Sequence, residues 1–298
     1  MPGGVCKRTA LDKPRGGDAY SAMRPVSAIL CPLCLLGFML AFSPPSAKAA
    51  PEAAEALPTA AAPEDDALDL YCLRQAYPAL AGLQKDEAGR QWLLFADGRR
   101  VLYRDAQPGG ADVAASMAAP YPLEPERPAT PPGVAPGRLR PYELFTALYG
   151  GDREGVGAGL VPVPWPGRQV RLSPAAAEAL ERVSRRLAPL LAERPDLRPY
   201  LKSEGGFAWR RIAGEDKLSA HAFGIAIDLN ARRAPYWRWS RQRPHPRQQD
   251  YPPEIVAAFE AEGFIWGGKW HEYDLMHFEY RPELICKARL RARPVPAF

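Results

Sequence analysis

The sequence lacks a hydrophobic run of the length that a membrane-spanning helix usually has. The apolar stretch near its N-terminus covers residues 28–42 and is closely followed by two prolines, whereas a spanning helix needs about 20 apolar residues. Arg24 precedes the stretch and the small residues Ala47 and Ala49 follow it, a pattern typical of an export signal. We therefore expect cleavage after Ala49 and a periplasmic or cell-wall-associated protein. Translation could instead begin at Met23. The alternative to cleavage is that the apolar stretch stays as a membrane anchor.

Cysteine is also scarce, with 5 in 298 residues. Neither Cys31 nor Cys34 follows the small residue that lipoprotein processing needs, which excludes a lipid-anchored signal. Both lie, like Cys6, in the segment that we expect to be removed, so Cys72 and Cys286 remain. In an exported chain, one cysteine at each end of the folded part favours a disulfide between them. Two free buried thiols are the alternative.

Acidic residues are nearly absent from residues 229–250, which contain six arginines and one acidic residue, Asp250. This segment therefore carries the same net charge, +5, as the whole chain. Basic residues interleaved with aromatic ones resemble a nucleic-acid surface, but an exported protein rarely meets nucleic acid, and we expect none as a partner. Attraction to an anionic cell-wall polymer and a plain solvated loop both remain open.

The sequence shows no internal repeat, and its composition divides it into five segments. Residues 1–49 are the expected signal peptide, and residues 50–66, rich in Ala, Pro and Glu, are a flexible lead. Residues 67–119 predict a small N-terminal subdomain. Residues 120–141 contain eight prolines, which prevent regular structure and predict a strap or linker. Residues 142–298 form the main domain.

Short local patterns predict several elements. A helix begins near Leu68 and ends at Pro78, and residues 91–104 form two strands joined by Asp97-Gly98. Apolar residues at helical spacing after Ser173-Pro174 predict a helix capped by the serine hydroxyl. Residues 253–262 predict a second helix that Gly263 terminates.

The stretch SAHAFGIAID, residues 219–228, combines two polar groups with an apolar strand pattern. Alternation along the strand sends Ile225 and Ile227 to the core and leaves Asp228 on a face otherwise lined by small residues. His221 lies just before the strand, where a turn could bring its ring over that space. Small residues beside a carboxylate indicate a site.

A second cluster follows at WHEYDLMHFE, residues 270–279. Alternation there places His277 and Glu279 on the face opposite to Met276 and Phe278, so His277 can project toward the first cluster. Two imidazoles and one carboxylate are a common set of ligands for catalytic zinc, which lowers the pKa of a bound water and polarises a carbonyl. Asp274 is the candidate proton acceptor, with Glu272 and His271 as rivals.

The stretches SAHAFGIAID, IWGGKW and DLMHFE resemble the zinc D-alanyl-D-alanine carboxypeptidases of VanY and VanX type, with the related L-alanyl-D-glutamate endopeptidases. The resemblance covers about residues 200–284. It implies one zinc ion held by His221, Asp228 and His277, with Asp274 as general base and then acid. It also implies an arginine that steadies a substrate carbonyl or carboxylate, as a planar fork can.

Arg210 matches this arginine best, although Arg211 is adjacent. Ser219 could donate to the substrate or cap a turn. Glu279 is expected to orient a metal ligand. Trp270 is a candidate wall of the cleft, and Trp266 is expected to cover the core.

The sequence thus predicts an exported α+β protein, with an antiparallel sheet, helices on one side and a zinc site on the open face. We expect a zinc peptidase that cuts the peptidoglycan stem, as a D-alanyl-D-alanine carboxypeptidase or as an endopeptidase. A zinc-containing module that only binds is one alternative, which Asp274 argues against. An iron oxygenase is another, but its first His and carboxylate are usually two residues apart and here they are seven apart. The sequence does not indicate an oligomeric state.

Overall fold

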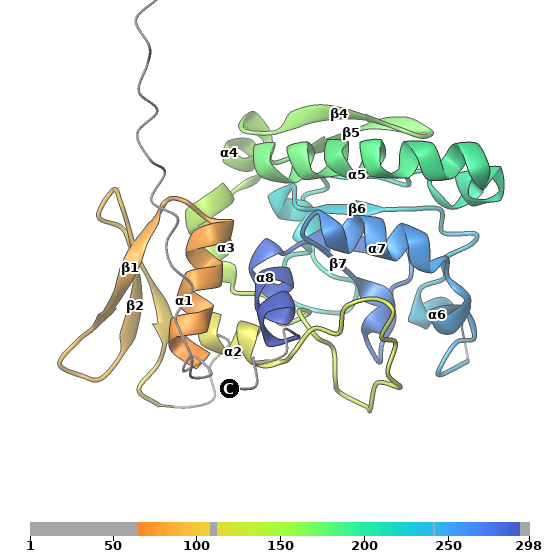
Figure 1. Ribbon diagram of the computed structural model, residues 1–298. Coiled ribbons are helices and arrows are strands. Elements are labelled where there is room, and N and C mark those ends of the chain that lie inside the picture. Colours follow the sequence, from red (N-terminus) through yellow and green to blue (C-terminus); the bar gives the residue numbers. More distant parts are fainter. Residues whose placement is uncertain (1–64, 108–111, 241, 293–298) are drawn as a thin grey trace, which may run out of the picture. The chain divides into compact units, whose positions relative to one another are not determined.

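The computed structural model describes residues 65–107, 112–240 and 242–292, all within a compact unit that spans residues 56–298 (Figure 1). The expected signal peptide lies outside the described residues. The expected lead overlaps them only at Asp65 and Asp66, which begin the first helix. No helix in the described ranges is long and apolar enough to cross a membrane.

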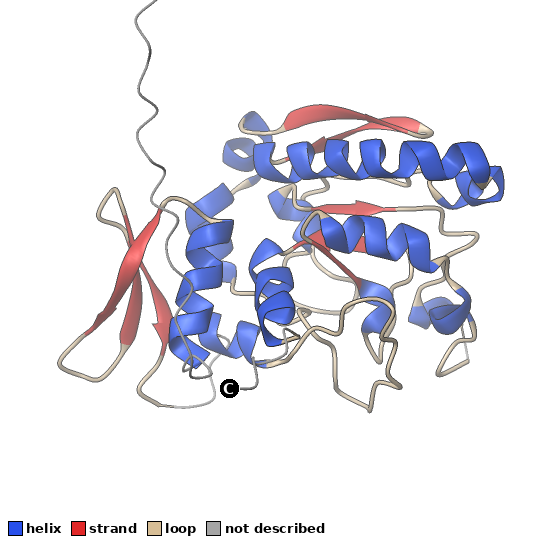
Figure 2. Ribbon diagram, viewed as in Figure 1, coloured by secondary structure: helices blue, strands red, loops and turns tan. Residues whose placement is uncertain are grey.

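The fold is α+β, as the sequence predicts, and its strands form three small antiparallel sheets with the orders β1-β2-β3, β4-β5 and β6-β8-β7 (Figure 2). The strands are β1 (Leu80–Lys85), β2 (Gln91–Phe95), β3 (Arg100–Arg104), β4 (Val161–Trp165), β5 (Arg168–Leu172), β6 (Ala226–Asp228), β7 (Phe264–Trp266) and β8 (His277–Tyr280). The α-helices are α1 (Asp65–Ala76), α2 (Val113–Ala118), α3 (Tyr142–Tyr149), α4 (Arg153–Ala158), α5 (Pro174–Glu193), α6 (Arg247–Asp250), α7 (Pro253–Ala261) and α8 (Pro282–Arg291). Short 3-10 helices cover Pro195–Tyr200, Ala220–Phe223, Trp237–Trp239 and Gly267–Lys269.

The predicted N-terminal helix and hairpin are present, together with a strand that the sequence did not reveal. α1 ends just before Pro78, and β2 and β3 pair as the hairpin. β1 joins β2 on its other edge. β1 gave no strand pattern because only Leu80 of its residues is buried and its register shifts near Gly82.

The N-terminal elements share a hydrophobic core with the C-terminal helix. α1 packs on α8, and the disulfide Cys72–Cys286 joins the two helices. Ile265 and Trp270 belong to this same core, so the first elements of the chain contact the segment that carries the candidate site. The domain boundaries drawn from composition stay a prediction.

Two predicted helices cover one face of the β6-β8-β7 sheet. α5 buries Leu180, Val183 and Leu187, and α7 packs against both α5 and β7. Ser173 stands at the N-cap of α5, but the predicted hydroxyl cap is absent. Its backbone N–H donates instead to the carbonyl of Gly224, and its buried hydroxyl finds no partner among the described residues. The residue links α5 to the loop before β6.

Residues 120–141, called the strap below, contain no helix or strand. Near the start of the strap, Lys269 Nζ lies 2.6 Å from Glu260 Oε1 and 3.3 Å from Glu124 Oε1. The Tyr121 hydroxyl donates to Glu260 at 2.7 Å and accepts from the backbone of β7. These four residues, called the anchor cluster below, tie the strap to α7. Because prolines prevent regular pairing, side chains hold the strap in place.

Candidate metal centre

The central strand of the third sheet sets two candidate ligands side by side. β8 pairs with β6 in a register that places Asp228 opposite His277. On the neighbouring positions, Ile227 and Phe278 face the core, where Phe278 stacks on Phe259 of α7. Because side chains alternate along a strand, Asp228 and His277 face away from the helices. The metal-binding groups therefore lie on the open face of the sheet, as predicted.

His221 reaches the same place from the 3-10 helix Ala220–Phe223. The chain leaves this helix through Gly224, which has a left-handed φ of +65°. A β-carbon at Gly224 would lie 2.3 Å from Leu160 Cδ2, so glycine meets both the conformational and the spatial requirement. The tight turn brings the imidazole of His221 back over Asp228.

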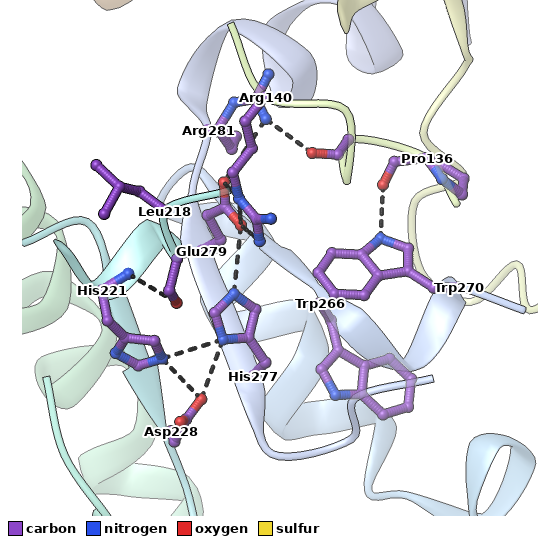
Figure 3. Close-up of polar contacts among 12 residues, drawn as sticks. Pro136, Arg140, Leu218, His221, Asp228, Trp266, Trp270, His277, Glu279 and Arg281 are labelled. Atoms are coloured by element: carbon purple, nitrogen blue, oxygen red, sulfur yellow. Dashed lines mark hydrogen bonds and ion pairs between the residues drawn. The ribbon is translucent and has the colours of Figure 1, made fainter. Parts of the chain in front are cut away.

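Three donor atoms converge at this point (Figure 3). His221 Nε2 lies 3.1 Å from Asp228 Oδ1 and 3.2 Å from His277 Nδ1. His277 Nδ1 lies 3.0 Å from the same carboxylate oxygen. The structure thus brings together the three residues that the sequence predicted as ligands.

The second nitrogen of each imidazole has its own acceptor. His221 Nδ1 lies 2.6 Å from the carbonyl oxygen of Gly206, and His277 Nε2 lies 3.3 Å from Glu279 Oε2. Protons on these two nitrogens leave the lone pairs of His221 Nε2 and His277 Nδ1 directed at one point. Such acceptors behind the ring orient metal-binding histidines in general.

Glu279 in turn lies between two buried arginines that the sequence did not indicate. Arg140 Nη2 donates to Glu279 Oε2 at 2.6 Å, and its Nε lies 3.1 Å from both carboxylate oxygens. Arg281 Nη1 is 3.6 Å from Glu279 Oε1. Arg281 is two residues away from Glu279 in sequence, but Arg140 is 139 residues away. No local pattern could have linked them.

A cavity of about 360 Å³ opens beside the donors and is lined by Asp228, Asp274 and His277 among others. Burial, and then the negative charge of Asp228, raise the pKa of Asp274 to about 6, although both histidines and Arg210 oppose this shift. Asp274 Oδ1 is buried and accepts no hydrogen bond from the described residues. Asp274 therefore brings a carboxylate to the wall of the cavity, and no described donor occupies its Oδ1.

The two candidate substrate arginines lie in different surroundings. Arg210 lines the cavity, is half exposed and has its Nη2 4.0 Å from Asp228 Oδ2. Arg211 forms an ion pair with Asp216 and lines a separate hollow. Ser219 lines the cavity and also accepts a hydrogen bond from the backbone of His221 at 3.4 Å. The geometry favours Arg210 over Arg211 as the arginine that meets a substrate.

The two tryptophans differ as expected from the sequence. Trp270 lines the cavity, and its Nε1 donates to the carbonyl of Pro136 in the strap at 2.7 Å. Trp266 is fully buried in the core, and its Nε1 donates to the carbonyl of Leu275. Trp270 thus joins the cavity to the strap.

Both rivals of Asp274 have side chains that contact the strap. Glu272 pairs with Arg138 of the strap at 2.6 Å. His271 Nδ1 lies 2.9 Å from the carbonyl of Thr130. Asp274 is therefore the better placed of the three.

Tyr236 and Trp239 also line the cavity, and the sequence analysis did not select them as site residues. Tyr236 bridges to Asp274 through the backbone, and Trp239 is 67% exposed. Both belong to the basic, aromatic segment 229–250. That segment therefore forms one wall of the cavity, and its attraction to an anionic polymer stays a prediction.

In the metal-free protein, the donor residues shift the pKa values of Asp228 and His277 in opposite directions. Burial alone would lower the pKa of His277, but hydrogen bonds to Asp228 and Glu279 and the nearby carboxylates raise it to about 9. Burial would raise the pKa of Asp228, yet the two histidines hold it well below its usual range. A cation that binds here must therefore displace a proton from His277.

The donor set fits zinc. Bonds of about 2.0 Å in a tetrahedral zinc site place its donor atoms about 3.3 Å apart. The three atoms here lie 3.0–3.2 Å apart. Two imidazoles and one carboxylate also leave a fourth position for water or substrate.

Residues 213–280 match a family model described as D-alanyl-D-alanine carboxypeptidase. The matched segment includes His221, Asp228, Asp274 and His277, and the match confirms the family resemblance of this part of the chain. No curated protein matches the chain.

Proposed function

We propose that this chain, whose site-bearing segment is that of a zinc metallopeptidase of the D-alanyl-D-alanine carboxypeptidase family, removes a terminal D-alanine from the peptidoglycan stem. One observation carries the proposal: three donor atoms for a metal converge at one point, and two of their residues, Asp228 and His277, line the same cavity as Asp274. A module that only binds would not need Asp274 there.

In this proposal Asp274 moves the protons. When bound, zinc acidifies a water molecule and polarises the substrate carbonyl. The Asp274 carboxylate accepts the proton and later donates it to the leaving amine. A carboxyl group with a pKa of about 6 can both take up and release a proton near neutral pH. A bound cation lowers this pKa, so the acidic limb of the rate profile is expected at or below pH 6.

Arg210 positions the substrate in this proposal. Its guanidinium lies at the cavity near Asp228, and the described residues give it no closer carboxylate than the one 4.0 Å away. A half-exposed guanidinium without a short ion pair can turn to hold a substrate carboxylate or carbonyl in its planar fork. Ser219 and Trp270 would form the adjacent walls.

An endopeptidase is the second candidate, because the site has space on two sides. A hollow of about 490 Å³ is lined by His221, Asp228 and Arg210 together with Gly205 and Gly206. Asp228 and Arg210 therefore separate this hollow from the cavity that holds Asp274. A substrate that extends past the metal in both directions would occupy both. Either activity acts on peptidoglycan, and we propose that the protein is exported to reach it.

Mass spectrometry of muropeptides digested by the zinc-loaded protein tests the proposal. Loss of one alanine mass supports the carboxypeptidase, and a split stem or crossbridge supports the endopeptidase. Asp274→Ala is the inactive control. Muropeptides that stay unchanged with a zinc-loaded wild type would contradict both. Iron as the bound metal would favour an oxygenase instead.

A further inference from the structure

We infer that Arg140 is a positioning residue of the metal centre, through which the strap holds the ligand His277 in place by way of Glu279. The inference rests on the proposed function in that it takes His277 as a metal ligand. The inference goes beyond the proposed function because it makes the proline-rich strap a part of the metal centre. The strap lies outside the segment that resembles peptidases.

The contacts form a continuous chain from the strap to the ligand (Figure 3). The guanidinium of Arg140 holds both oxygens of Glu279, and Glu279 Oε2 faces His277 Nε2 at 3.3 Å. The side chains are almost inaccessible to water, with exposed fractions of 4% for Arg140, 0% for Glu279 and 5% for His277. Glu279 itself has no exposed surface, so it depends on these protein partners.

Arg140 is the main partner of the Glu279 carboxylate. Arg281 is farther away, since its Nη1 lies 3.6 Å from Glu279 Oε1 and donates to the carbonyl of Gly137. Its Nε donates to Glu283, and its buried Nη2 has no partner among the described residues. Without the guanidinium of Arg140, the buried carboxylate would lose its bidentate partner and would have to turn or take up a proton. Either change moves or weakens the acceptor that aims His277 Nδ1 at the metal.

The strap fixes Arg140 from several directions. The carbonyl of Pro136 accepts from Trp270, and the carbonyl of Gly137 accepts from Arg281. At Gly137 a β-carbon would lie 2.5 Å from Ile265 and 2.8 Å from Leu284, so the backbone lies directly on the core. Arg138 pairs with Glu272 and Glu215 at the cavity. The segment that carries Arg140 is therefore docked beside the site.

Zinc affinity of the full-length chain tests the inference, with Arg140→Gln as the variant. Loss of a partner behind a metal ligand typically costs 10–100-fold in metal affinity, so we expect the zinc Kd to rise by about that factor. We also expect a changed absorption spectrum of the cobalt-substituted protein, because the His277 ring shifts. Arg140→Lys keeps the charge but not the fork and should recover part of the affinity.

Arg127→Gln is the matched control. Arg127 is also a nearly buried arginine of the strap and pairs with Glu124, while its Nη1 donates to carbonyls near α6. Among the described residues it contacts none of the three donors or Glu279. We expect this variant to lower thermal stability while the zinc Kd and the cobalt spectrum stay as in the wild type.

The outcomes separate the inference from the proposed function. A wild type that binds no zinc overturns the metal centre itself. A wild type that binds zinc tightly, with Arg140→Gln within twofold of it, overturns only the role of Arg140. Equal weakening in Arg140→Gln and Arg127→Gln also overturns that role, because it would reflect a loosened strap. If Arg140→Gln does not fold, Arg140→Lys must show the weaker zinc Kd or the inference fails.

Discussion

The strap is held at both ends by buried ion pairs, and the two ends differ in what lies behind them. At its start, Lys269 pairs with Glu260 and Glu124 in the anchor cluster. At its end, Arg140 pairs with Glu279. Both pairs are shielded from water, yet the first touches only structural residues, whereas the second touches His277. Buried charge by itself therefore does not identify a functional site, whereas contact with a proposed metal ligand gives a buried ion pair a testable role.

The anchor cluster also shows why a buried ion pair is a poor measure of stability. Burial raises the pKa of Glu260 even though Lys269 and the Tyr121 hydroxyl act to lower it. The desolvation of the carboxylate thus outweighs the attraction to its partners. Such pairs are costly to break and contribute little when intact. We expect substitutions in the anchor cluster to change the free energy of unfolding, and substitutions at Arg140 to change the zinc affinity.

The largest effect is expected from Asp274→Asn, which removes the proton acceptor and leaves both ends of the strap intact. The turnover rate should fall about 10²–10⁴-fold, the usual contribution of a general base. Zinc content and melting temperature should match the wild type. Glu272→Gln is the control and should keep most of the activity. Activity that survives in Asp274→Asn but not in Glu272→Gln would reverse the assignment.

Lys269→Met should act on stability alone. It leaves two buried carboxylates without their cation, which typically costs about 3–5 kcal/mol in the free energy of unfolding. Urea unfolding measures this loss, and Arg182→Met, which breaks an exposed pair with Glu262, should cost less than about 1 kcal/mol. The folded fraction of Lys269→Met should bind zinc as the wild type does. A tenfold change in the zinc Kd of Lys269→Met would contradict the claim that the start of the strap affects stability alone.

The disulfide offers a milder test of the same distinction. Replacing Cys72 and Cys286 together by serine should lower the free energy of unfolding by about 2–5 kcal/mol, because the bond joins α1 to α8 across 214 residues. Neither cysteine contacts the donor atoms, so zinc affinity should not change. Denaturant unfolding with and without a reducing agent gives the comparison for the wild type. No loss on reduction would contradict a structural role.

The smallest effect is a pH dependence of zinc binding. In the metal-free protein the pKa of His277 is about 9, so below pH 9 the ring holds a proton that zinc must displace. The apparent zinc affinity should therefore rise about tenfold per pH unit between pH 7 and 9 and then level off. Zinc titrations in a pH series measure this slope. A flat profile would mean that no proton leaves on binding.

The sequence predicted the donors because they lie on short, regular stretches. Strand alternation gave the open face for Asp228 and His277, and the turn before the first strand gave His221. Spacing offered Asp274 with two rivals, and the family resemblance then implied the roles of all four residues. The α+β class, the hairpin and the helices α5 and α7 followed from periodicity and turn residues.

Other features could not be predicted, because their causes are not local. Arg140 meets Glu279 across 139 residues, and nothing in RLRP distinguishes it from other surface-like arginines. β1 has no alternating pattern to detect. Ser173 has the residue type of an N-cap, but its backbone bond to Gly224 ties it to another loop. Arg210 and Arg211 are neighbours in sequence and line one hollow together, but of the two only Arg210 also lines the cavity beside the donors, and Arg211 pairs with Asp216.

Zinc stoichiometry tests the central claim most directly. Metal analysis of the purified full-length chain, its His277→Ala variant and the control His245→Ala is sufficient, because His245 lies outside the donor set. We expect one zinc per chain in the wild type and in His245→Ala, and little or none in His277→Ala. A wild type without zinc, or a His277→Ala variant that keeps it in full, would contradict the metal centre described above.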